Sequence, residues 1–477
     1  MKVRRFGAMV SAVALLAGCS GGGSGSMAGG GTSGGGSTPT PTSGACSLAS
    51  RQAWAKAQLD EWYLFPETLP ATLDPAPYPT VSAYIDALTA TARSQGRDRY
   101  FTYLTSIAEE NAFFNSGSSA GFGVRLTYDT AARRVIVAEA FEGTTALAAG
   151  IDRGTEILAI GTTASNLRSV SDILATEGVD GITNALGPTT AGTTRVLRLT
   201  GTGGDRDVTL AKADYSLDPV SSRYGAKIIT EGGHQYGYLN LRTFINTADP
   251  ELRAAFQSFR TAGVTDVVID LRYNGGGLVA ISELIGDLLG AARSGSNVLD
   301  YTTFRASKSS NNDTRFFQPK PQSIAPTRIA FIGTGGTASA SELTINAQIP
   351  YLHANAALIG SNTYGKPVGQ IAVDQAACDD RFRIIAFATE NANHQGGYFT
   401  GLKCTVEASC SAADDLSHPM GDPSEASTRS ALDFLQGKAC TPIASSGQVA
   451  QKVRAGGQEL LIPARPSAAQ HEVPGLF

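Results

Sequence analysis

The chain has 477 residues, of which 42% are hydrophobic, and its formal net charge is −4 at pH 7. This length is typical of about three domains, and the apolar content is sufficient for real hydrophobic cores. The slightly acidic balance lacks the basic footprint of nucleic-acid-binding proteins, so no nucleic-acid partner is expected. After the N-terminal region, no stretch is long and apolar enough to predict a transmembrane helix.

The first 19 residues have the pattern of an export signal. Basic residues within 1–5 precede an apolar stretch at 8–17, which is too short for a comfortable membrane span. The stretch ends in Leu16-Ala17-Gly18-Cys19, which resembles the bacterial lipobox, whose cysteine becomes the lipidated first residue. Segment 1–19 is therefore predicted to be a lipoprotein signal with lipidation at Cys19. The alternative is an ordinary secretory signal in which Cys19 is incidental.

Residues 20–45 consist almost entirely of Gly, Ser, Thr, Ala and Pro. Such a composition cannot bury a core, so this segment is predicted to be a flexible linker. A lipid anchor followed by such a linker would hold a soluble body away from a membrane. The expected location is the bacterial cell envelope, lipid-anchored and exported, either facing the periplasm or at the outer membrane.

Five cysteines follow Cys19, and an exported protein can pair them in disulfides. Because five is odd, at most two bridges can form and one thiol is left over. The sequence leaves the pairing open. The spacings fit no standard zinc site and HExxH is absent, so structural bridges are favoured over metal binding. These cysteines are Cys46, Cys378, Cys404, Cys410 and Cys440.

Residues 46–118 have helical patterns and are predicted to form a small helical N-terminal domain with no chemistry of its own. Apolar residues from Trp54 to Tyr63 recur at helical spacing, a run of prolines interrupts the pattern over 66–79, and a second helix is expected at 80–93.

Residues 119–215 change to short β-like runs separated by glycine-rich turns, and they resemble a PDZ domain. The resemblance lies in Gly121-Phe122-Gly123-Val124, in the turn 148–151 and in the run 157–160, although Thr155 stands where that family usually has Asp. A PDZ domain binds an extended peptide by strand addition, and backbone N–H groups capture the terminal carboxylate. The resemblance therefore implies a peptide-binding site at Gly121, Phe122, Gly123 and Val124. The alternative is a generic β-rich domain.

Residues 216–440 alternate buried strands and amphipathic helices, which predicts βαβ units and a largely parallel sheet. The remaining residues, 441–477, are expected to be a C-terminal tail. The whole chain is thus expected to be multidomain, with mixed α/β and β architecture. Three unusual loops follow buried strands, at 272–277, 334–339 and 361–366. Because ligands bind at the carboxyl ends of parallel strands, these loops are predicted to share one crevice.

Ser339 begins a predicted helix, and two interpretations of it are open. Ser339-x-x-Glu342 is a capping box before an apolar run, which is a purely structural role. A hydroxyl at a helix N-terminus is also a suitable nucleophile, because unpaired N–H groups beside it stabilise an oxyanion. Ser341 is the rival nucleophile. No histidine stands in a Ser-His-Asp pattern, but a buried lysine can serve as base, and Lys366 lies in the third loop.

Together these motifs resemble the C-terminal processing, or tail-specific, serine peptidases over roughly residues 120–440. The segment 337–342 is similar to their nucleophile motif, 363–366 to their lysine motif, and 270–277 to their D-L-R-x-N-x-G-G motif. Two features depart from the family: Pro367 replaces a favoured Gly, and the Ser-to-Lys interval is slightly longer. The resemblance implies catalytic residues Ser339, Lys366 and Gln370, and oxyanion-hole residues Gly277 and Ala340.

The implied activity is that of a serine endopeptidase that cleaves envelope proteins or peptides without a cofactor or metal. The PDZ-like segment would recruit C-terminal tails of the substrates, and the membrane would be contacted through the lipid anchor. The alternative function is a non-catalytic peptide-binding or scaffold lipoprotein on the same fold, because a fold does not fix function.

Overall fold

The computed structural model describes residues 44–201, 204–444 and 458–477. The predicted signal at 1–19, with Cys19, lies outside the described residues, and so does most of the predicted linker at 20–45. In the described part of the chain, no helix has the length and apolar character needed to cross a bilayer.

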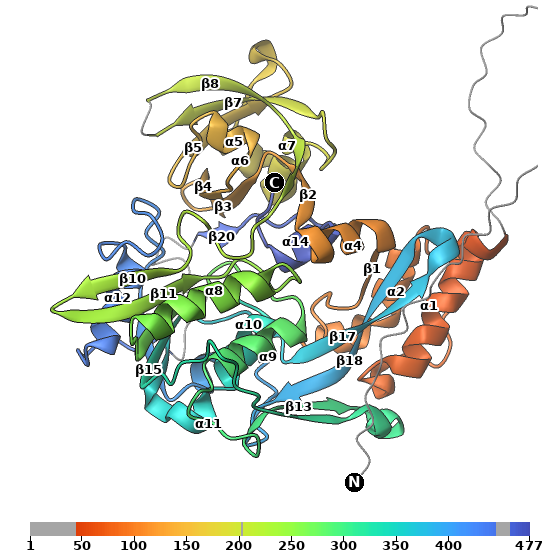
Figure 1. Cartoon of the computed structure of the whole chain (residues 1–477). Helices are drawn as coiled ribbons and strands as arrows, with labels where there is room; N and C mark the ends of the chain where they lie inside the picture. The colour runs from red at the N-terminus through yellow and green to blue at the C-terminus, as the bar shows by residue number, and fades with distance from the viewer. Residues whose placement is uncertain (1–43, 202–203, 445–457) are drawn as a thin grey trace, which may run out of the picture. The chain divides into compact units, whose positions relative to one another are not determined.

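A six-stranded sheet forms the centre of the region that carries the three loops (Figure 1). Five of its strands are parallel, and only the first pair is an antiparallel hairpin. This bears out the predicted βαβ units. In spatial order the strands are β10 (Lys227–Glu231), β11 (His234–Asn240), β12 (Asp266–Asp270), β15 (Arg328–Gly333), β16 (Ala356–Gly360) and β19 (Ala408–Ser411).

Helices cover both faces of this sheet, which explains why its central strands are apolar along their whole length. Within β12, Val267 and Ile269 pack in one cluster with α8 and α9, and Val268 packs in a second cluster with α12. The mixed α/β class predicted from the sequence is therefore confirmed. The helices of this region are α8 (Ala248–Thr261), α9 (Val279–Leu288), α10 (Ala340–Asn346), α11 (Ile349–Leu352) and α12 (Ala426–Leu435).

Residues 118–216, called the β-module below, have their own apolar cluster and their own sheet. The sheet order is β20-β3-β4-β5-β7-β8, with β6 paired to β5, and β2 pairs separately with β9. One member, β20 (Glu459–Leu460), comes from far along the chain. The other elements are β2 (Ser118–Gly121), β3 (Val124–Asp129), β4 (Arg134–Ala140), α5 (Thr145–Ala148), β5 (Glu156–Gly161), β6 (Arg168–Ser169), α6 (Val170–Thr176), α7 (Gly178–Leu186), β7 (Thr194–Thr200), β8 (Arg206–Ala211) and β9 (Ala213–Ser216).

The N-terminal segment contains the expected helices, but it shares its core with distant strands. Apolar side chains of α1 and α2 pack in one cluster with Phe382 and Ile384 of β18. A strand that the helical pattern does not indicate, β1, pairs with β18. The elements are α1 (Leu48–Trp62), α2 (Val81–Leu88), α3 (Ala90–Ser94), β1 (Tyr103–Ser106) and α4 (Ile107–Ser116). The other strands in the sheet of β1 are β13 (Val298–Phe304), β14 (Asp313–Phe316), β17 (Val368–Gln375) and β18 (Asp380–Glu390).

Two disulfides form in the described residues, as the odd cysteine count allowed. Cys46 is bonded to Cys378, which ties the start of the N-terminal segment to the turn between β17 and β18. Cys410 in β19 is bonded to Cys440, and Cys404 is an exposed free thiol. The predicted bridges are therefore confirmed, with one thiol left over.

Candidate active site

The three loops predicted to share a crevice do meet, because β12, β15 and β16 are parallel neighbours that end at the same edge. Ala338 donates its N–H to the Asn274 carbonyl at 3.0 Å, which joins the second loop to the first. Tyr364 donates its N–H to the Thr337 carbonyl at 2.9 Å, which joins the third loop to the second. The second loop, which carries Ser339, is therefore fixed from both sides.

Ser339 immediately precedes α10 and has an unusual backbone conformation, with φ 55° and ψ −116°. A positive φ is disfavoured for a residue with a side chain, so the surrounding contacts must hold it in place. One contact is with Gly276, where an added Cβ would lie 2.8 Å from the Ser339 Cβ. The lack of a side chain at Gly276 thus lets the first loop pass directly beside Ser339. The Ser339 side chain remains partly exposed.

Ser341, the rival nucleophile, has a different environment. Its side chain is completely buried, and its hydroxyl donates a hydrogen bond of 3.0 Å to the Asn274 carbonyl. This contact gives Ser341 a structural role between the first two loops, and it leaves Ser339 as the more accessible of the two hydroxyl groups.

Glu342 joins the nucleophile loop to the lysine loop. Its Oε2 accepts the Ser339 N–H at 3.1 Å and the Lys366 N–H at 2.7 Å, and its Oε1 accepts the Gly365 N–H at 2.7 Å. The side chain is fully buried, and this burial raises the pKa of Glu342 while the backbone N–H donors oppose the rise. The capping box seen in the sequence therefore has a second role, because the same carboxylate also positions the loop of Lys366.

Replacing Glu342 with alanine should lower the free energy of unfolding by about 2–3 kcal/mol, because three backbone N–H groups would lose their acceptor. Turnover should fall as well, since both loops would loosen. Urea unfolding measures the stability. Glu109, an exposed glutamate in the first turn of α4, offers a matched control. Glu109→Ala should change stability by about 0.5 kcal/mol or less. Equal effects of the two substitutions would contradict the role assigned to Glu342.

Lys366 lies in an environment that disfavours its charged form. Its Nζ donates a hydrogen bond of 3.0 Å to Gln370 Oε1 and lies 5.2 Å from the centre of the Phe101 ring. Burial lowers the pKa of the Lys366 ammonium, and the negative charge of Glu472 works against this decrease. Among the described residues, the hydrogen-bond acceptor of Lys366 Nζ is Gln370, and no hydrogen bond joins Lys366 to the Ser339 hydroxyl.

The N-terminal segment holds the lysine loop in position. A guanidinium nitrogen of Arg99 donates to the carbonyls of Tyr364 and Gly365, each at 2.6 Å. The Gln370 amide donates to the Phe101 carbonyl. Gln370 therefore contacts Lys366 with one end of its amide and the N-terminal segment with the other. No local pattern in 46–118 signals these contacts, because they join residues more than 260 positions apart.

Gly277 and Ala340, the predicted oxyanion donors, lie on the two loops that meet at Ser339. The strand-like contact near Gly277 uses the N–H groups of Phe244 and Leu278, so the Gly277 N–H is outside that ladder. Gly277 has φ 131°, and an added Cβ there would lie 2.3 Å from the Phe244 carbonyl oxygen. Ala340 is the first residue of α10, whose first N–H groups have no partner within the helix. An added Cβ at Gly276 would lie 3.0 Å from the Ala340 nitrogen.

A network of buried charged residues holds the first loop in place. Arg272 is almost fully buried and donates to Asp270 at 3.0 Å and, through two nitrogens, to Glu425 at 2.9 Å. The neighbouring Tyr273 donates its hydroxyl to Asp414, which also accepts Arg153 of the β-module at 2.8 Å. Satisfied ion pairs of this kind fix geometry, because each lost partner would leave a buried charge uncompensated.

The four residues predicted to bind peptides lie where β2 ends and β3 begins. Phe122 is buried, and Gly123 has φ 80° with no room for a side chain beside Thr144. The N–H groups of Gly123 and Val124 donate to the backbone oxygen of Phe477 at 2.9 and 3.1 Å. In this structure the predicted peptide-binding loop therefore contacts another part of the same chain.

Two further residues close to Lys366 come from α14 (Ala468–Glu472) in the predicted tail. His471 stacks on Tyr103 with ring centres 3.7 Å apart, and burial lowers the pKa of His471 to about 3. The Glu472 carbonyl accepts the Gly275 N–H at 3.0 Å, and burial raises the pKa of its carboxyl. No spacing in the sequence indicates that these residues reach the site.

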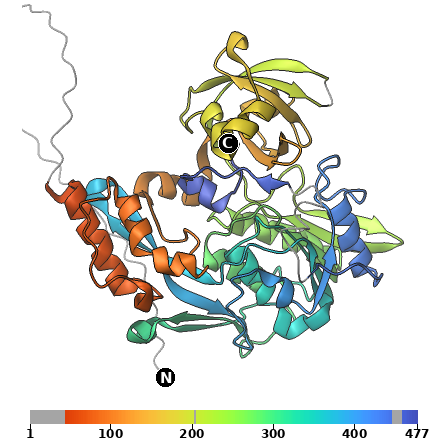
Figure 2. The same cartoon turned by 180° about the vertical axis from the view of Figure 1, so that it is seen from behind.

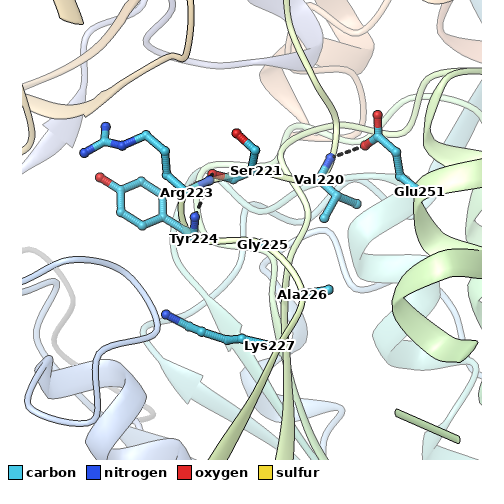
Figure 3. A pocket seen from close by; sticks show the side chains of 9 residues that line it. Val220, Ser221, Arg223, Tyr224, Gly225, Ala226, Lys227 and Glu251 are labelled. Atoms are coloured by element: carbon cyan, nitrogen blue, oxygen red, sulfur yellow. Dashed lines mark hydrogen bonds between the residues drawn. The ribbon is translucent and has the colours of Figure 1, made fainter. Parts of the chain in front are cut away.

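A separate pocket contains none of the residues of the three loops. It is lined by residues 220–227 and Glu251 (Figure 3). Its polar groups already have partners, because Val220 donates its N–H to Glu251 at 2.8 Å and Tyr224 donates its N–H to Ser221 at 2.9 Å. We therefore assign the chemistry to the loop crevice.

Several known proteins are similar to this chain. The chloroplast carboxyl-terminal-processing peptidase 3 of Arabidopsis thaliana is 27% identical over 274 residues, which cover 56% of this chain and 49% of that protein. The chloroplast C-terminal processing peptidase of Tetradesmus obliquus is 27% identical over 271 residues, which cover 54% of each. The chain thus spans about half the length of these curated relatives.

The crystal structure of a protein described as an S41 protease from Bacteroides fragilis has a similar fold. It aligns with a TM-score of 0.60 and 22% identity, and the match covers 80% of this chain and 97% of the other. At that identity the likeness concerns the fold. The model of peptidase family S41 matches residues 235–402, a range that contains all three loops, Ser339 and Lys366. Residues 235–402 of this chain are therefore a peptidase family S41 domain.

Proposed function

We propose that the chain is a serine endopeptidase in which Ser339 is the nucleophile and Lys366 the general base. The observation that supports this most directly is the shared carboxylate of Glu342, which binds the backbone of both residues at once. A nucleophile and a base that depend on one buried anchor keep their relative position, which proton transfer requires.

The reaction is acyl transfer. Neutral Lys366 takes the proton of the Ser339 hydroxyl, and the Ser339 oxygen forms a bond to the peptide carbonyl carbon. The N–H groups of Gly277 and Ala340 stabilise the resulting oxyanion. The carbon–nitrogen bond then breaks, and the leaving amine takes the proton from the Lys366 ammonium. Water attacks the acyl-enzyme, transfers a proton through Lys366, and releases the product and the Ser339 hydroxyl.

Gln370 is the positioning residue for the base. It accepts a hydrogen bond from Lys366 and is itself held by the Phe101 carbonyl, so its amide oxygen has a fixed orientation. The register of the β17–β18 pair shifts between Gly369 and Gln370. Such irregularities change the direction of side chains near functional sites. For catalysis, the flexible lysine chain must turn from Gln370 towards Ser339.

The substrates in this proposal are proteins or peptides whose C-terminal tails bind the β-module, which we interpret as PDZ-like. The support is the position of Gly121, Phe122, Gly123 and Val124 at the start of β3. The N–H groups of Gly123 and Val124 bind the backbone oxygen of Phe477 there. Backbone N–H groups in such a loop capture a carboxylate, and the strand edge binds the residues before it.

The proposed location is the cell envelope, with the protein anchored through a lipid on Cys19. Cys19→Ala should leave the signal uncut by lipoprotein processing or should release the protein from the membrane, because the acceptor of the lipid is lost. Membrane fractionation and the mass of the mature N-terminus measure this outcome. Unchanged processing and membrane association in Cys19→Ala would contradict the anchor.

A fluorophosphonate probe tests the catalytic proposal and separates it from a non-catalytic binding or scaffold role. A serine peptidase should gain the mass of the probe on the peptide that contains Ser339, and labelled protein should lose cleavage of a peptide substrate. A scaffold should bind peptides without labelling. The control is the denatured chain, which should not react because the activated geometry is lost.

A further inference from the structure

Residues 459–461 and 475–477 contact one edge of β3 in the β-module. Figure 2 shows the C-terminal part of the chain, in dark blue, beside the β-module. Within β20, Glu459 and Leu460 pair with Tyr128 and Thr127. The Leu461 N–H donates to the Leu126 carbonyl at 2.9 Å. One part of this segment therefore already occupies the half of the β3 edge that is farther from the predicted carboxylate loop.

The end of the segment occupies the other half. The Leu126 N–H donates to the Gly475 carbonyl at 2.8 Å, and Phe477 donates its own N–H to the Val124 carbonyl at 2.8 Å. Together with the bonds from Gly123 and Val124 to the Phe477 oxygen, this is the pattern of strand addition. Residues 475–477 lie where a peptide ligand of the β-module would lie.

The side chain of Phe477 shows which residue this position accepts. It is only 2% exposed and belongs to the apolar cluster of the β-module, with Phe122 and Leu186. Burying an aromatic side chain of this size is favourable because a large apolar surface is removed from water. The binding position next to the Gly123 N–H therefore suits a large apolar residue and disfavours a charged one.

The same segment also contacts two of the three active-site loops. An added Cβ at Gly275 would lie 2.8 Å from the carbonyl oxygens of His471 and Glu472, and one at Gly336 would lie 2.4 Å from the Leu460 side chain. Gly336 belongs to the nucleophile loop and Gly275 to the first loop. Residues 458–477 thus contact the first loop and the loop that carries Ser339, and they also pair with the β3 edge.

Groups around Lys366 act on its pKa in both directions: burial is the largest influence and lowers the pKa, and Glu472 of the segment opposes this decrease. The negative charge of Glu472 favours the ammonium, and the more weakly coupled Asp98 and Glu342 act in the same direction. Arg383 acts in the opposite direction, as burial does. Near α14, His471 is kept neutral by burial and by Lys366 itself, and the Tyr103 phenol stays protonated because burial raises its pKa.

We propose that residues 458–477 are a built-in ligand that occupies the peptide groove and the catalytic crevice together, and that a substrate tail ending in a large apolar residue displaces residues 475–477. The binding of residues 475–477 to the β-module is inferred from their contacts with the β3 edge. The expected effect of displacement on turnover rests on the proposed peptidase function. The proposed substrate class is proteins or peptides with a terminal residue similar to Phe.

A purely structural brace is the competing interpretation. Ala469, Val473 and Leu476 pack with Phe113 and Ile245 in an apolar cluster, so part of the segment contributes to folding. A brace would not be displaced by peptides, whereas a built-in ligand would. The experiment must therefore measure competition rather than stability alone.

The binding test uses the full chain carrying Ser339→Ala and a fluorescein-labelled peptide Glu-Val-Pro-Gly-Leu-Phe with a free carboxylate, followed by fluorescence anisotropy. Adding Phe477→Asp should tighten peptide binding by about tenfold or more, because the competing ligand no longer fills its site. Phe316 is an aromatic residue at the end of β14 that is 40% exposed, and Phe316→Asp should leave the affinity unchanged. A peptide that ends in Asp should bind at least about tenfold more weakly than the Phe peptide.

The activity test uses the unmodified chain and a separate peptide substrate. The unlabelled Phe peptide should raise turnover, and Phe477→Asp should raise basal turnover and remove the response to the peptide. Circular dichroism checks that the variant is folded. If Phe477→Asp is not folded, the unmodified chain distinguishes the two interpretations, because the Phe peptide should activate it only if residues 475–477 can be displaced.

Equal peptide affinity with and without Phe477→Asp in folded protein, or measurable turnover of the unmodified chain that does not change when the Phe peptide is added, would overturn the proposal. Binding is measured on a chain without its nucleophile, so a failure of the peptidase function would appear as absent turnover with competition intact.

Discussion

Replacing Ser339 with alanine should lower peptide turnover by about 10⁴-fold or more, because the atom that attacks the carbonyl is lost. The fold should survive. Glu342 would still accept the backbone N–H of residue 339, and a capping hydroxyl contributes only about 1 kcal/mol. The measurements are single-turnover cleavage of a peptide and circular dichroism of both proteins.

Ser341→Ala is the internal control for this experiment. Ser341 is buried and donates to the Asn274 carbonyl, so its loss should cost about 1 kcal/mol of stability and only a modest part of the activity. A dead Ser341→Ala together with an active Ser339→Ala would show that the nucleophile has been assigned to the wrong serine.

The strands and loops of the central sheet could be predicted from sequence because their signals are local. Apolar runs at 266–271 and 328–333 indicate strands buried on both faces, and the structure has strands at Asp266–Asp270 and Arg328–Gly333. Parallel pairing then follows from the helices between them, and it brings the three loops to one edge. The meeting of the loops of Ser339 and Lys366 is thus a consequence of topology, and it needed no long-range information.

The supports of the site could not be predicted, because they depend on contacts between distant segments. Residues 46–118 were expected to form a helical domain without chemistry, whereas Arg99 and Phe101 hold the lysine loop. Residues 441–477 were expected to be a tail, whereas Glu472 and Phe477 reach the lysine and the β-module. Helical or polar patterns say which face of a segment is buried, but they do not say which sheet it is buried against.

The role of Glu342 shows a different limit. The spacing from Ser339 to Glu342 correctly indicated a capping box, which is a local motif. The second oxygen of the same carboxylate binds the Gly365 N–H, more than twenty residues further along the chain. A local motif can therefore be recognised and still leave two of the three N–H groups bound by the Glu342 carboxylate unexplained.

Lys366→Ala and Lys366→Arg should both lower turnover by about 10³-fold or more, for different reasons. Alanine leaves no group that accepts the proton of Ser339. Arginine keeps the positive charge and has a pKa above about 12, so it cannot act as a base near neutral pH. Equal loss in both variants would show that the proton acceptor is essential and that charge alone does not suffice. Cleavage at the parent rate by Lys366→Arg would rule out the Ser-Lys mechanism.

The pH dependence of the unmodified chain gives an independent test of the same base. The working form of Lys366 is neutral, so turnover should rise as the pH increases through the pKa of this group. Burial lowers that pKa, so the rise should come below the value of about 10.4 that is typical of an exposed lysine. Glu472→Gln removes the charge that favours the ammonium in the bound form of 458–477. In the absence of competing peptide, it should therefore move the start of the rise to lower pH. A profile that falls with increasing pH would mean that the protonated lysine is the active form, which a general base cannot be.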